Sequence, residues 1–114
     1  MRYTVSIKKN RDFRRLYAKG KTAVNAYLVV YCRRNKTAVN RLGLTVGTRV
    51  GKAVVRNRVR RLIRESYRLR EEQVKKGYDI VIVARTRAAG ASYWKIDAAL
   101  AALLKKVGLC EAEV

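Results

Sequence analysis

The apolar and polar residues of the chain follow two different periods, which together predict a mixed succession of helices and strands. In three segments apolar residues recur every three or four positions, as they do on the buried face of an amphipathic helix. In three others they alternate with polar residues or run together, as they do in strands. The predicted helices cover residues 10–19, 53–74 and 93–107, and the predicted strands cover residues 24–33, 41–47 and 78–87.

Capping residues mark the boundaries of the predicted helices. Asn10 and Ser92 are placed to cap the first and last helices, because their side-chain oxygens can accept a hydrogen bond from a free backbone N–H group. Gly20, Gly77 and Gly108 follow the three helices, and glycine readily adopts the backbone conformation that ends a helix.

The strand predicted over 78–87 contains five consecutive apolar residues, Ile80 to Ala84. Such a run suits a strand that is covered on both faces, so we expect it at the centre of the sheet. The strands over 24–33 and 41–47 are predicted to be antiparallel to each other, and a weaker signal indicates a short extra strand over 21–23. The sum is a single-domain α+β protein, an α/β sandwich ordered as helix, two or three strands, helix, strand and helix.

The helix predicted over 53–74 carries an unusual distribution of charge. Its segment from Val55 to Arg70 holds seven arginines and a single acid, Glu65. At 100° per residue, one arc of the helix is apolar and faces the core, whereas the opposite arc is basic. The apolar arc holds Val55, Val59, Leu62, Ile63, Ser66 and Leu69, and the basic arc holds Arg56, Asn57, Arg60, Arg61, Arg64 and Arg68.

The basic arc needs a negative partner from outside the chain. Like charges four residues apart destabilise a helix by a few tenths of a kcal/mol, and the series from Arg56 to Arg68 repeats that spacing three times. Solvated helix faces usually mix charges of both signs, and this one does not. Phosphate is the best candidate partner, because the planar guanidinium group matches two phosphate oxygens.

Charge and composition extend this interpretation to the whole chain. Its 114 residues include 28 lysines and arginines but only 8 acidic residues, which gives a formal net charge of +20. Hydrophobic residues make up 49% of the sequence, so the charge belongs to a foldable domain and not to a disordered tail. A basic folded domain of this kind is typical of a nucleic-acid-binding protein.

Residue types that carry catalysis are scarce. The absence of histidine removes the most frequent general base and zinc ligand. The acidic residues form no sequence pair suited to two-metal hydrolysis, and the chain has no glycine-rich phosphate loop. Cys32 and Cys110 lack metal-ligand spacing and indicate a reduced protein, and no segment is apolar enough to cross a membrane. We therefore expect no catalytic residue and no metal site in the chain.

A resemblance to a known family rests on the start of the basic helix. The segment GKAVVRNRVRRLIRES, residues 51–66, resembles the protein subunit of bacterial ribonuclease P, in which the Arg-Asn-Arg triplet is characteristic. The resemblance covers nearly the whole chain, and its supporting segments are KKNRDFRRLYAKG, RLGLTVGTRVGKAV, DIVIVART and SYWKIDAAL.

The resemblance implies an accessory subunit and not a catalyst. In that family the RNA subunit removes the 5′ leader from precursor tRNA with Mg²⁺, while the small basic protein binds the catalytic RNA and the leader. We expect these two RNAs as partners, no cofactor in the protein itself, no obligatory protein partner and a bacterial cytoplasmic location. The family also implies a left-handed connection from the strand before the basic helix to the strand after it, although such crossovers are normally right-handed.

The family motif implies two groups of site residues. One is a leader cleft between the first helix and the sheet, matched here by Phe13, Tyr17 and Tyr31, although spacing alone favours core packing for these aromatics. The other group is the RNA-binding surface of the basic helix and the loop leading into it. The roles of two of its members stay open, because Asn57 also suits a cap or the end of a turn and Arg58 lies beyond the main basic arc. The implied RNA-binding residues are Arg49, Lys52, Arg56, Asn57, Arg58, Arg60, Arg61, Arg64 and Arg68.

Two other function classes remain as alternatives. A structural RNA-binding protein, for example one associated with the ribosome, shares the need for a basic helix but not for an aromatic cleft. An autonomous nuclease needs a catalytic site that is assembled only by folding.

Overall fold

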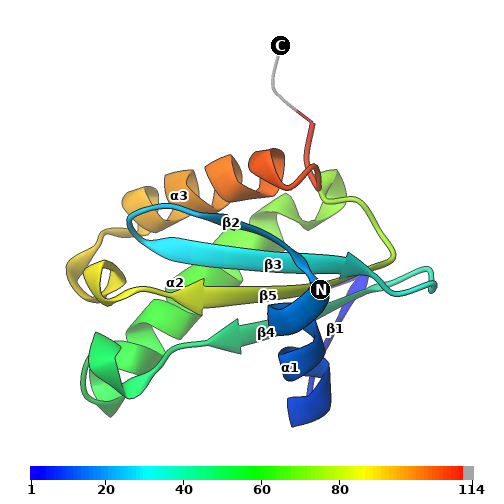
Figure 1. Ribbon diagram of the computed structural model, residues 1–114. Helices are drawn as coiled ribbons and strands as arrows, with labels where there is room; N and C mark the ends of the chain where they lie inside the picture. The colour runs from blue at the N-terminus through cyan, green and yellow to red at the C-terminus, as the bar shows by residue number, and fades with distance from the viewer. Residues whose placement is uncertain (112–114) are drawn as a thin grey trace.

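A five-stranded sheet separates two layers of helices in the computed structural model of the chain, which describes residues 1–111 (Figure 1). Helix α1 lies in front of the sheet in Figure 1, and α2 and α3 lie behind it. The elements, with η for 3₁₀ turns, are β1 (Thr4–Ser6), α1 (Asn10–Lys19), β2 (Lys21–Val24), β3 (Leu28–Arg34), β4 (Asn40–Thr45), η1 (Thr48–Val50), α2 (Ala53–Arg70), η2 (Glu71–Gln73), β5 (Tyr78–Ala84), η3 (Thr86–Gly90) and α3 (Tyr93–Lys106).

Strand β5 lies at the centre of the sheet, whose order is β1-β4-β5-β3-β2. Ile80, Val81 and Ile82 are fully buried, because helices cover both faces at this position. The central position predicted from the apolar run is therefore confirmed, as is the short strand predicted near 21–23.

The predicted relation between the strands over 24–33 and 41–47 needs correction. Strands β3 and β4 do run in opposite directions, but they do not pair, because β5 pairs with β3 on one side and with β4 on the other. The first of the two predicted strands is also divided. The side-chain oxygen of Asn25 accepts hydrogen bonds from the N–H groups of Tyr27 and Leu28, at 3.0 Å each, and this turn separates β2 from β3. Strand β1, which pairs in parallel with β4, was not predicted.

The connection from β4 through α2 to β5 is left-handed. In Figure 1 the arrows of β4 and β5 both point to the left, β5 lies above β4, and α2 passes behind the sheet. The unusual handedness implied by the family resemblance is thus present. It places the whole length of α2 on the face opposite α1.

The two faces of the sheet carry cores of different size. A small core under α1 contains Ile7, Leu16 and Val81, with Phe13 and Tyr31 packed against it at its margin. The larger core lies between the opposite face and helices α2 and α3. Its largest fully buried side chains are Leu28, Ile63, Tyr67, Ile80, Ile82, Ile96, Leu100, Leu103, Leu104 and Leu109.

The buried stripe of α2 differs in part from the predicted apolar arc. Val59, Ile63 and Ser66 are buried as predicted, but Leu69 is 59% exposed, and the fully buried residue at this end is Tyr67. The phenol of Tyr67 shares a 3.0 Å hydrogen bond with the Thr4 hydroxyl, and it also accepts a 3.3 Å hydrogen bond from the side-chain amide of Asn40. These polar partners come from distant strands and allow a tyrosine to be buried.

The helix ends agree with the sequence in part. Ser92 caps α3 as predicted, its hydroxyl accepting a 3.3 Å hydrogen bond from the Lys95 N–H. Asn10 is instead the first residue of α1, and the N-cap position makes no side-chain hydrogen bond. Helix α2 ends at Arg70 and not at 74, because the chain tightens there into η2.

Two aspartates form ion pairs with arginines on neighbouring elements, one between α2 and α3 and the other between β4 and β5. The carboxylate of Asp97 accepts hydrogen bonds of 3.1 and 2.7 Å from Arg70 and one of 2.7 Å from the Ser66 hydroxyl. Asp79 accepts a 2.8 Å hydrogen bond from Nε of Arg41. The hydrogen bond from Arg70 lowers the pKa of Asp97 below its usual 3.8. Burial raises the pKa of Asp79, but the hydrogen bonds from Arg41 and Asn35 outweigh it, and the pKa is again lowered.

These lowered pKa values predict a loss of stability in acid. Both carboxyl groups bind a proton less readily in the folded chain than in the unfolded one, so their contribution is complete above the unfolded pKa of 3.8 and is lost as the pH falls through the folded values. Urea unfolding between pH 7 and pH 2.5 measures this loss. Asp97→Asn should lower the free energy of unfolding at pH 7 and weaken its pH dependence. Glu72→Gln, at an exposed acid, should change neither, and equal curves for all three proteins would contradict the assignment.

Candidate nucleic-acid interface

The basic surface predicted on α2 is present in the structure. Arg61, Arg64 and Arg68 are exposed, and Arg56 and Arg60 are partly exposed along the same helix. The loop that leads into α2 adds the exposed side chains of Arg49 and Lys52. Because the buried stripe fixes the rotation of the helix, these cations project away from the core.

Within the described part of the chain, most cations of this surface have no acidic partner. Among residues 1–111, Arg68 is the one member of the predicted set that forms an ion pair, with Glu65 at 2.6 Å. Hydrogen bonds from Arg68 lower the pKa of Glu65. The rest of the predicted surface therefore presents uncompensated positive charge, which favours a polyanion. Arg68 has to exchange its ion pair with Glu65 for one with a phosphate before it can contribute as much to polyanion binding as the unpaired cations.

Neutral acceptors orient three of the arginines. Nε of Arg56 donates a 3.1 Å hydrogen bond to the carbonyl oxygen of Gly51, in the loop that precedes the helix. An Arg60 N–H group donates to the side-chain oxygen of Asn57 at 3.1 Å. An Arg58 N–H group donates to the carbonyl oxygen of Ala91 at 3.2 Å, between η3 and α3.

These contacts separate the roles of the characteristic triplet. Asn57 lies inside α2, four residues after its start, so it does not cap the helix but positions the Arg60 guanidinium. Arg58 points towards the start of α3 and connects two elements, which agrees with its position beyond the basic arc. Only Arg56 and Asn57 of the triplet thus belong geometrically to the α2 surface.

The three aromatic residues predicted to line a cleft are brought together between α1 and the sheet. The ring centroids of Tyr17 and Tyr31 are 5.0 Å apart in an edge-to-face arrangement, and those of Phe13 and Tyr17 are 6.5 Å apart. The Tyr17 hydroxyl also forms a 2.9 Å hydrogen bond with the hydroxyl of Thr45. Tyr17 is 43% exposed, whereas Phe13 and Tyr31 are partly buried against the small core.

A glycine allows Phe13 to lie directly on the sheet. A Cβ atom at Gly43 would come within 2.6 Å of the Phe13 ring, so no larger residue fits there without displacing the ring. Phe13 is consequently both a packing residue and a cleft residue: one part of its ring packs on β4 and another remains at the surface of the cleft.

The aromatic cleft opens into a cavity of about 450 Å³ between α1 and the end of β4. Sequence reasoning did not single out Arg14 or Thr45, which line it together with Asn10, Phe13 and Tyr17. The adjacency of Arg14 to Phe13 on a helix is a signal that could have identified the arginine. Thr45 lies on a different strand, so no local pattern relates it to the cleft.

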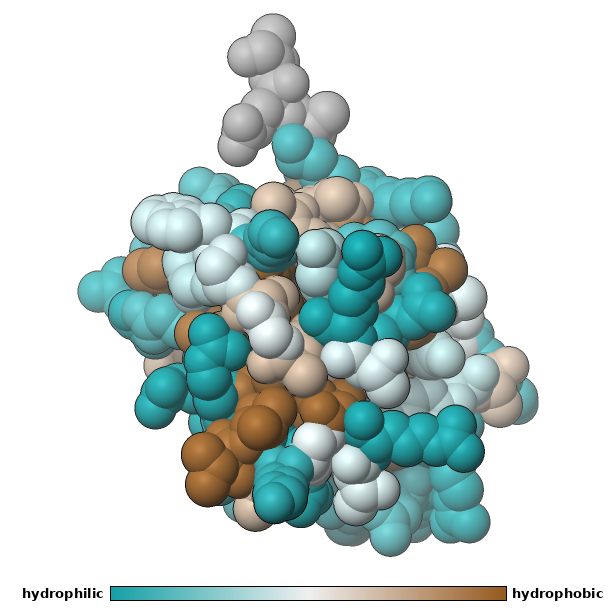
Figure 2. Space-filling model, turned by 90° about the vertical axis from the view of Figure 1, so that its left-hand side faces the viewer, coloured by the Kyte–Doolittle hydropathy of each residue, from teal (hydrophilic) through white to brown (hydrophobic). Residues whose placement is uncertain are grey.

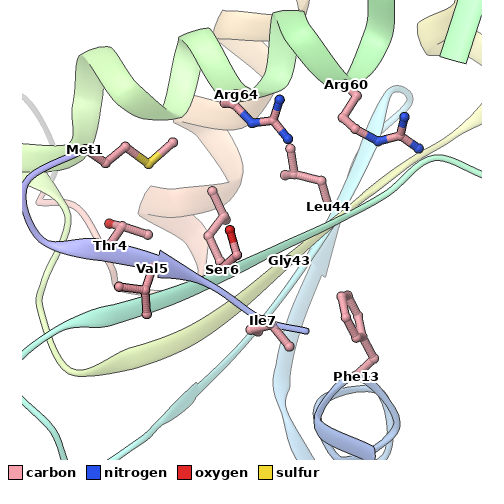
Figure 3. Close-up of a pocket in the computed structure, with 11 residues that line it drawn as sticks. Met1, Thr4, Val5, Ser6, Ile7, Phe13, Gly43, Leu44, Arg60 and Arg64 are labelled. Carbon is pink, nitrogen blue, oxygen red and sulfur yellow. The ribbon is translucent and has the colours of Figure 1, made fainter. Parts of the chain in front are cut away.

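A second cavity, of about 220 Å³, joins the cleft to the basic surface (Figure 3). Arg60 and Arg64 extend from α2 towards the edge of β4, and Phe13 approaches the same edge from α1. Two sites that the sequence indicated separately are therefore neighbours in space.

Within residues 1–111, no group of three or more acidic residues or cysteines that could hold a metal ion occurs. None of the helices in that range is long and apolar enough to cross a membrane.

Comparison with known proteins identifies the family. The sequence model of the family described as Ribonuclease P matches residues 1–108. The chain belongs to the ribonuclease P protein family. It is 48% identical over 108 residues to the ribonuclease P protein component of Alkaliphilus oremlandii, covering 95% of both chains, and 50% identical over 104 residues to that of Clostridium botulinum strain Langeland, covering 90% of this chain and 94% of the relative.

Solved structures of ribonuclease P proteins share the fold. The protein from Staphylococcus aureus superposes with a TM-score of 0.86 at 36% identity, covering 93% of this chain and 97% of that one. The protein from Thermotoga maritima gives 0.81 at 33% identity, covering 89% and 96%. Membership of the ribonuclease P family implies a role in an RNA-cleaving enzyme and an RNA partner in a ribonucleoprotein. It favours this role over the ribosome-associated alternative.

The geometry of the α2 surface predicts different effects for two of its arginines. In this ribonuclease P protein, Arg60→Ala should weaken RNA binding and reduce the slope of log affinity against log salt by about 0.7 to 0.9, because one phosphate contact is lost. Arg58→Gln should lower the melting temperature, because the hydrogen bond to the Ala91 carbonyl is lost, and should leave the slope unchanged. Equal slopes for Arg60→Ala and the wild type would mean that Arg60 faces water in the complex.

Proposed function

We propose that this chain is the accessory subunit that binds the catalytic RNA of ribonuclease P through α2 and the 5′ leader of precursor tRNA in the aromatic cleft. In this proposal the protein improves leader removal by positioning the substrate and by screening the charge between two RNAs. The RNA carries out the cleavage, and Mg²⁺ belongs to the RNA–protein complex. Precursor tRNA is processed in the bacterial cytoplasm, where we place the protein.

The observation that carries the proposal is the cavity shared by Phe13, Arg60 and Arg64. A strand of RNA leaving the α2 surface at this point reaches the aromatic cleft without crossing the core of the sheet. The same arginines can therefore face the catalytic RNA and the phosphates of a leader that enters the cleft. A purely structural RNA-binding protein has no need for this continuity.

The chemistry of the cleft suits an unpaired strand of variable sequence. Stacking on an aromatic side chain contributes about 1–3 kcal/mol per base and is available to every base, since all bases have a flat π-face. Tyr17 and Tyr31 provide such rings, and Arg14, which lines the cavity together with Tyr17, supplies a cation for the RNA backbone. Mature tRNA lacks the leader, so a grip on the leader favours binding of precursor over product.

Reconstitution with the catalytic RNA tests the proposed function. The purified chain should accelerate removal of the leader from labelled precursor tRNA at a low Mg²⁺ concentration, where the RNA alone reacts slowly. The reason is that the cationic side chains of the bound protein substitute for part of the charge screening that Mg²⁺ otherwise provides. Parallel reactions contain each component alone. A rate unchanged by the protein would contradict the proposal, and cleavage by the protein alone would support the autonomous nuclease.

Substitution of a cleft tyrosine tests the leader assignment. Tyr31→Ala should weaken the affinity of the holoenzyme for precursor tRNA by about 5- to 150-fold, the equivalent of one lost stacking contact, and should leave the affinity for mature tRNA nearly unchanged. Tyr31→Phe keeps the ring and should behave like the wild type.

Trp94→Ala removes an aromatic residue that is 76% exposed and is outside the cleft, so it controls for a general loss of aromatic surface. Binding curves for both RNAs measure the difference directly. An equal loss of affinity for precursor and mature tRNA in Tyr31→Ala would contradict the assignment of the leader to the cleft.

A further inference from the structure

The chain segments around the end of the sheet at which β4 and β5 finish are basic and contain no acidic residue. The segments 42–64 and 80–96 include no aspartate or glutamate, yet they contain ten lysines and arginines. Beyond the α2 surface described above, they contribute Arg85, Arg87 and Lys95. This positive charge therefore extends past α2 to a part of the chain that the proposed function does not use.

The topology brings two loops together at this end. Strands β4 and β5 are parallel neighbours, with Thr45 opposite Val83, so their carboxyl ends share one edge of the sheet. The 3₁₀ turns η1 and η3 follow these strands and pack against each other. Arg49 and Arg85, which are 36 residues apart, consequently line the same cavity.

That cavity, of about 450 Å³, combines apolar and polar walls. Figure 2 shows this end of the molecule, with apolar surface bordered by hydrophilic side chains. Arg85 lines this cavity, and one of its N–H groups donates a 2.7 Å hydrogen bond to the carbonyl oxygen of Asn25, in the turn between β2 and β3. The apolar lining residues are Val50, Val83 and Ala84, and the hydroxyl-bearing ones are Thr45, Thr48 and Thr86.

The lining matches the chemistry of a single unpaired nucleotide. Apolar side chains accept the face of a base, hydroxyl groups can pair with its edge, and arginines on the rim can contact the flanking phosphates. The cavity also continues the α2 surface, since Arg49 and Lys52 belong to the loop between them. A polyanion already bound along α2 would thus reach the cavity without a gap in positive charge.

We propose that the cavity between η1 and η3 binds an unpaired nucleotide of the catalytic RNA, and that Arg85 is an RNA-binding residue of this chain. The inference rests on the proposed function. It extends the proposed RNA-binding surface from one helix to two loops at the end of the sheet. The lining of this cavity shares Thr45 alone with the aromatic-cleft cavity that we assign to the leader.

Two glycines provide a matched test of the cavity. A Cβ atom added at Gly47, which lines the cavity, meets no atom within 4 Å, and the backbone φ of −75° is suitable for any residue. Gly47→Leu should therefore fold normally, reduce the space for a base and weaken the affinity for the catalytic RNA by about tenfold. Gly90→Leu, where an added Cβ atom is equally free of contacts and lies outside the cavity lining, should bind like the wild type.

A charge-matched pair tests the arginine. Arg85→Gln should reduce the slope of log affinity against log salt by about 0.7 to 0.9, as the loss of one phosphate contact does. Arg34→Gln makes the same change of net charge at the exposed end of β3 and should leave the slope unaltered. Melting temperatures of all four variants verify that each is folded at the temperature of the binding assay.

The outcomes separate this inference from the proposed function. If the wild type binds the catalytic RNA and stimulates cleavage while Gly47→Leu binds it equally well, the nucleotide cavity is wrong and the proposed function stands. Equal weakening by Gly47→Leu and Gly90→Leu, or equal slopes for Arg85→Gln and Arg34→Gln, would also overturn the inference. Failure of the wild type to bind the RNA overturns both.

Discussion

Burial of one stripe of α2 against the sheet determines where the arginines of this helix point. Val59, Ile63 and Tyr67 are fully buried, and each large apolar side chain stabilises the fold by about 1.5–3 kcal/mol. Repulsion between like charges one turn apart costs only a few tenths of a kcal/mol per pair. Packing therefore outweighs repulsion, and the helix can hold an uncompensated row of cations in place before any RNA is bound.

Local patterns were sufficient for all three helices and for most of the strands, but not for the short strand β1, the turn at Asn25 or the arrangement of the elements. The central position of β5 follows from its own apolar run, and Ser92 is recognisable as a cap from its immediate neighbours. The order of the strands depends on partners far away in the chain, and β3 and β4 are separated by a strand that comes more than thirty residues later. Tyr67 is buried instead of Leu69 because Thr4 and Asn40 offer hydrogen-bond partners to its hydroxyl, which a helical wheel does not include.

In the candidate site too, what lies within one helix could be predicted, and what depends on residues far apart in the sequence could not. The basic face of α2 could be predicted, because charge and apolar spacing lie within one helix. The aromatic cleft could not be separated from ordinary core packing on spacing alone, and only the family resemblance placed Phe13, Tyr17 and Tyr31 together. The structure explains the ambiguity: Phe13 lies on Gly43 as a packing residue and also borders two cavities.

The shortness of β1 connects the two halves of the site. Strand β1 pairs with β4 only from Asn40 to Leu42, so the outer edge of the remaining residues of β4 has no strand partner within residues 1–111. The cavity that Phe13 shares with Arg60 and Arg64 lies at this uncovered edge and is lined by Gly43 and Leu44. A β1 longer by three residues would cover the edge and separate the aromatic face of the sheet from the basic face. The early end of this edge strand therefore allows the proposed RNA-binding surface to continue around the sheet.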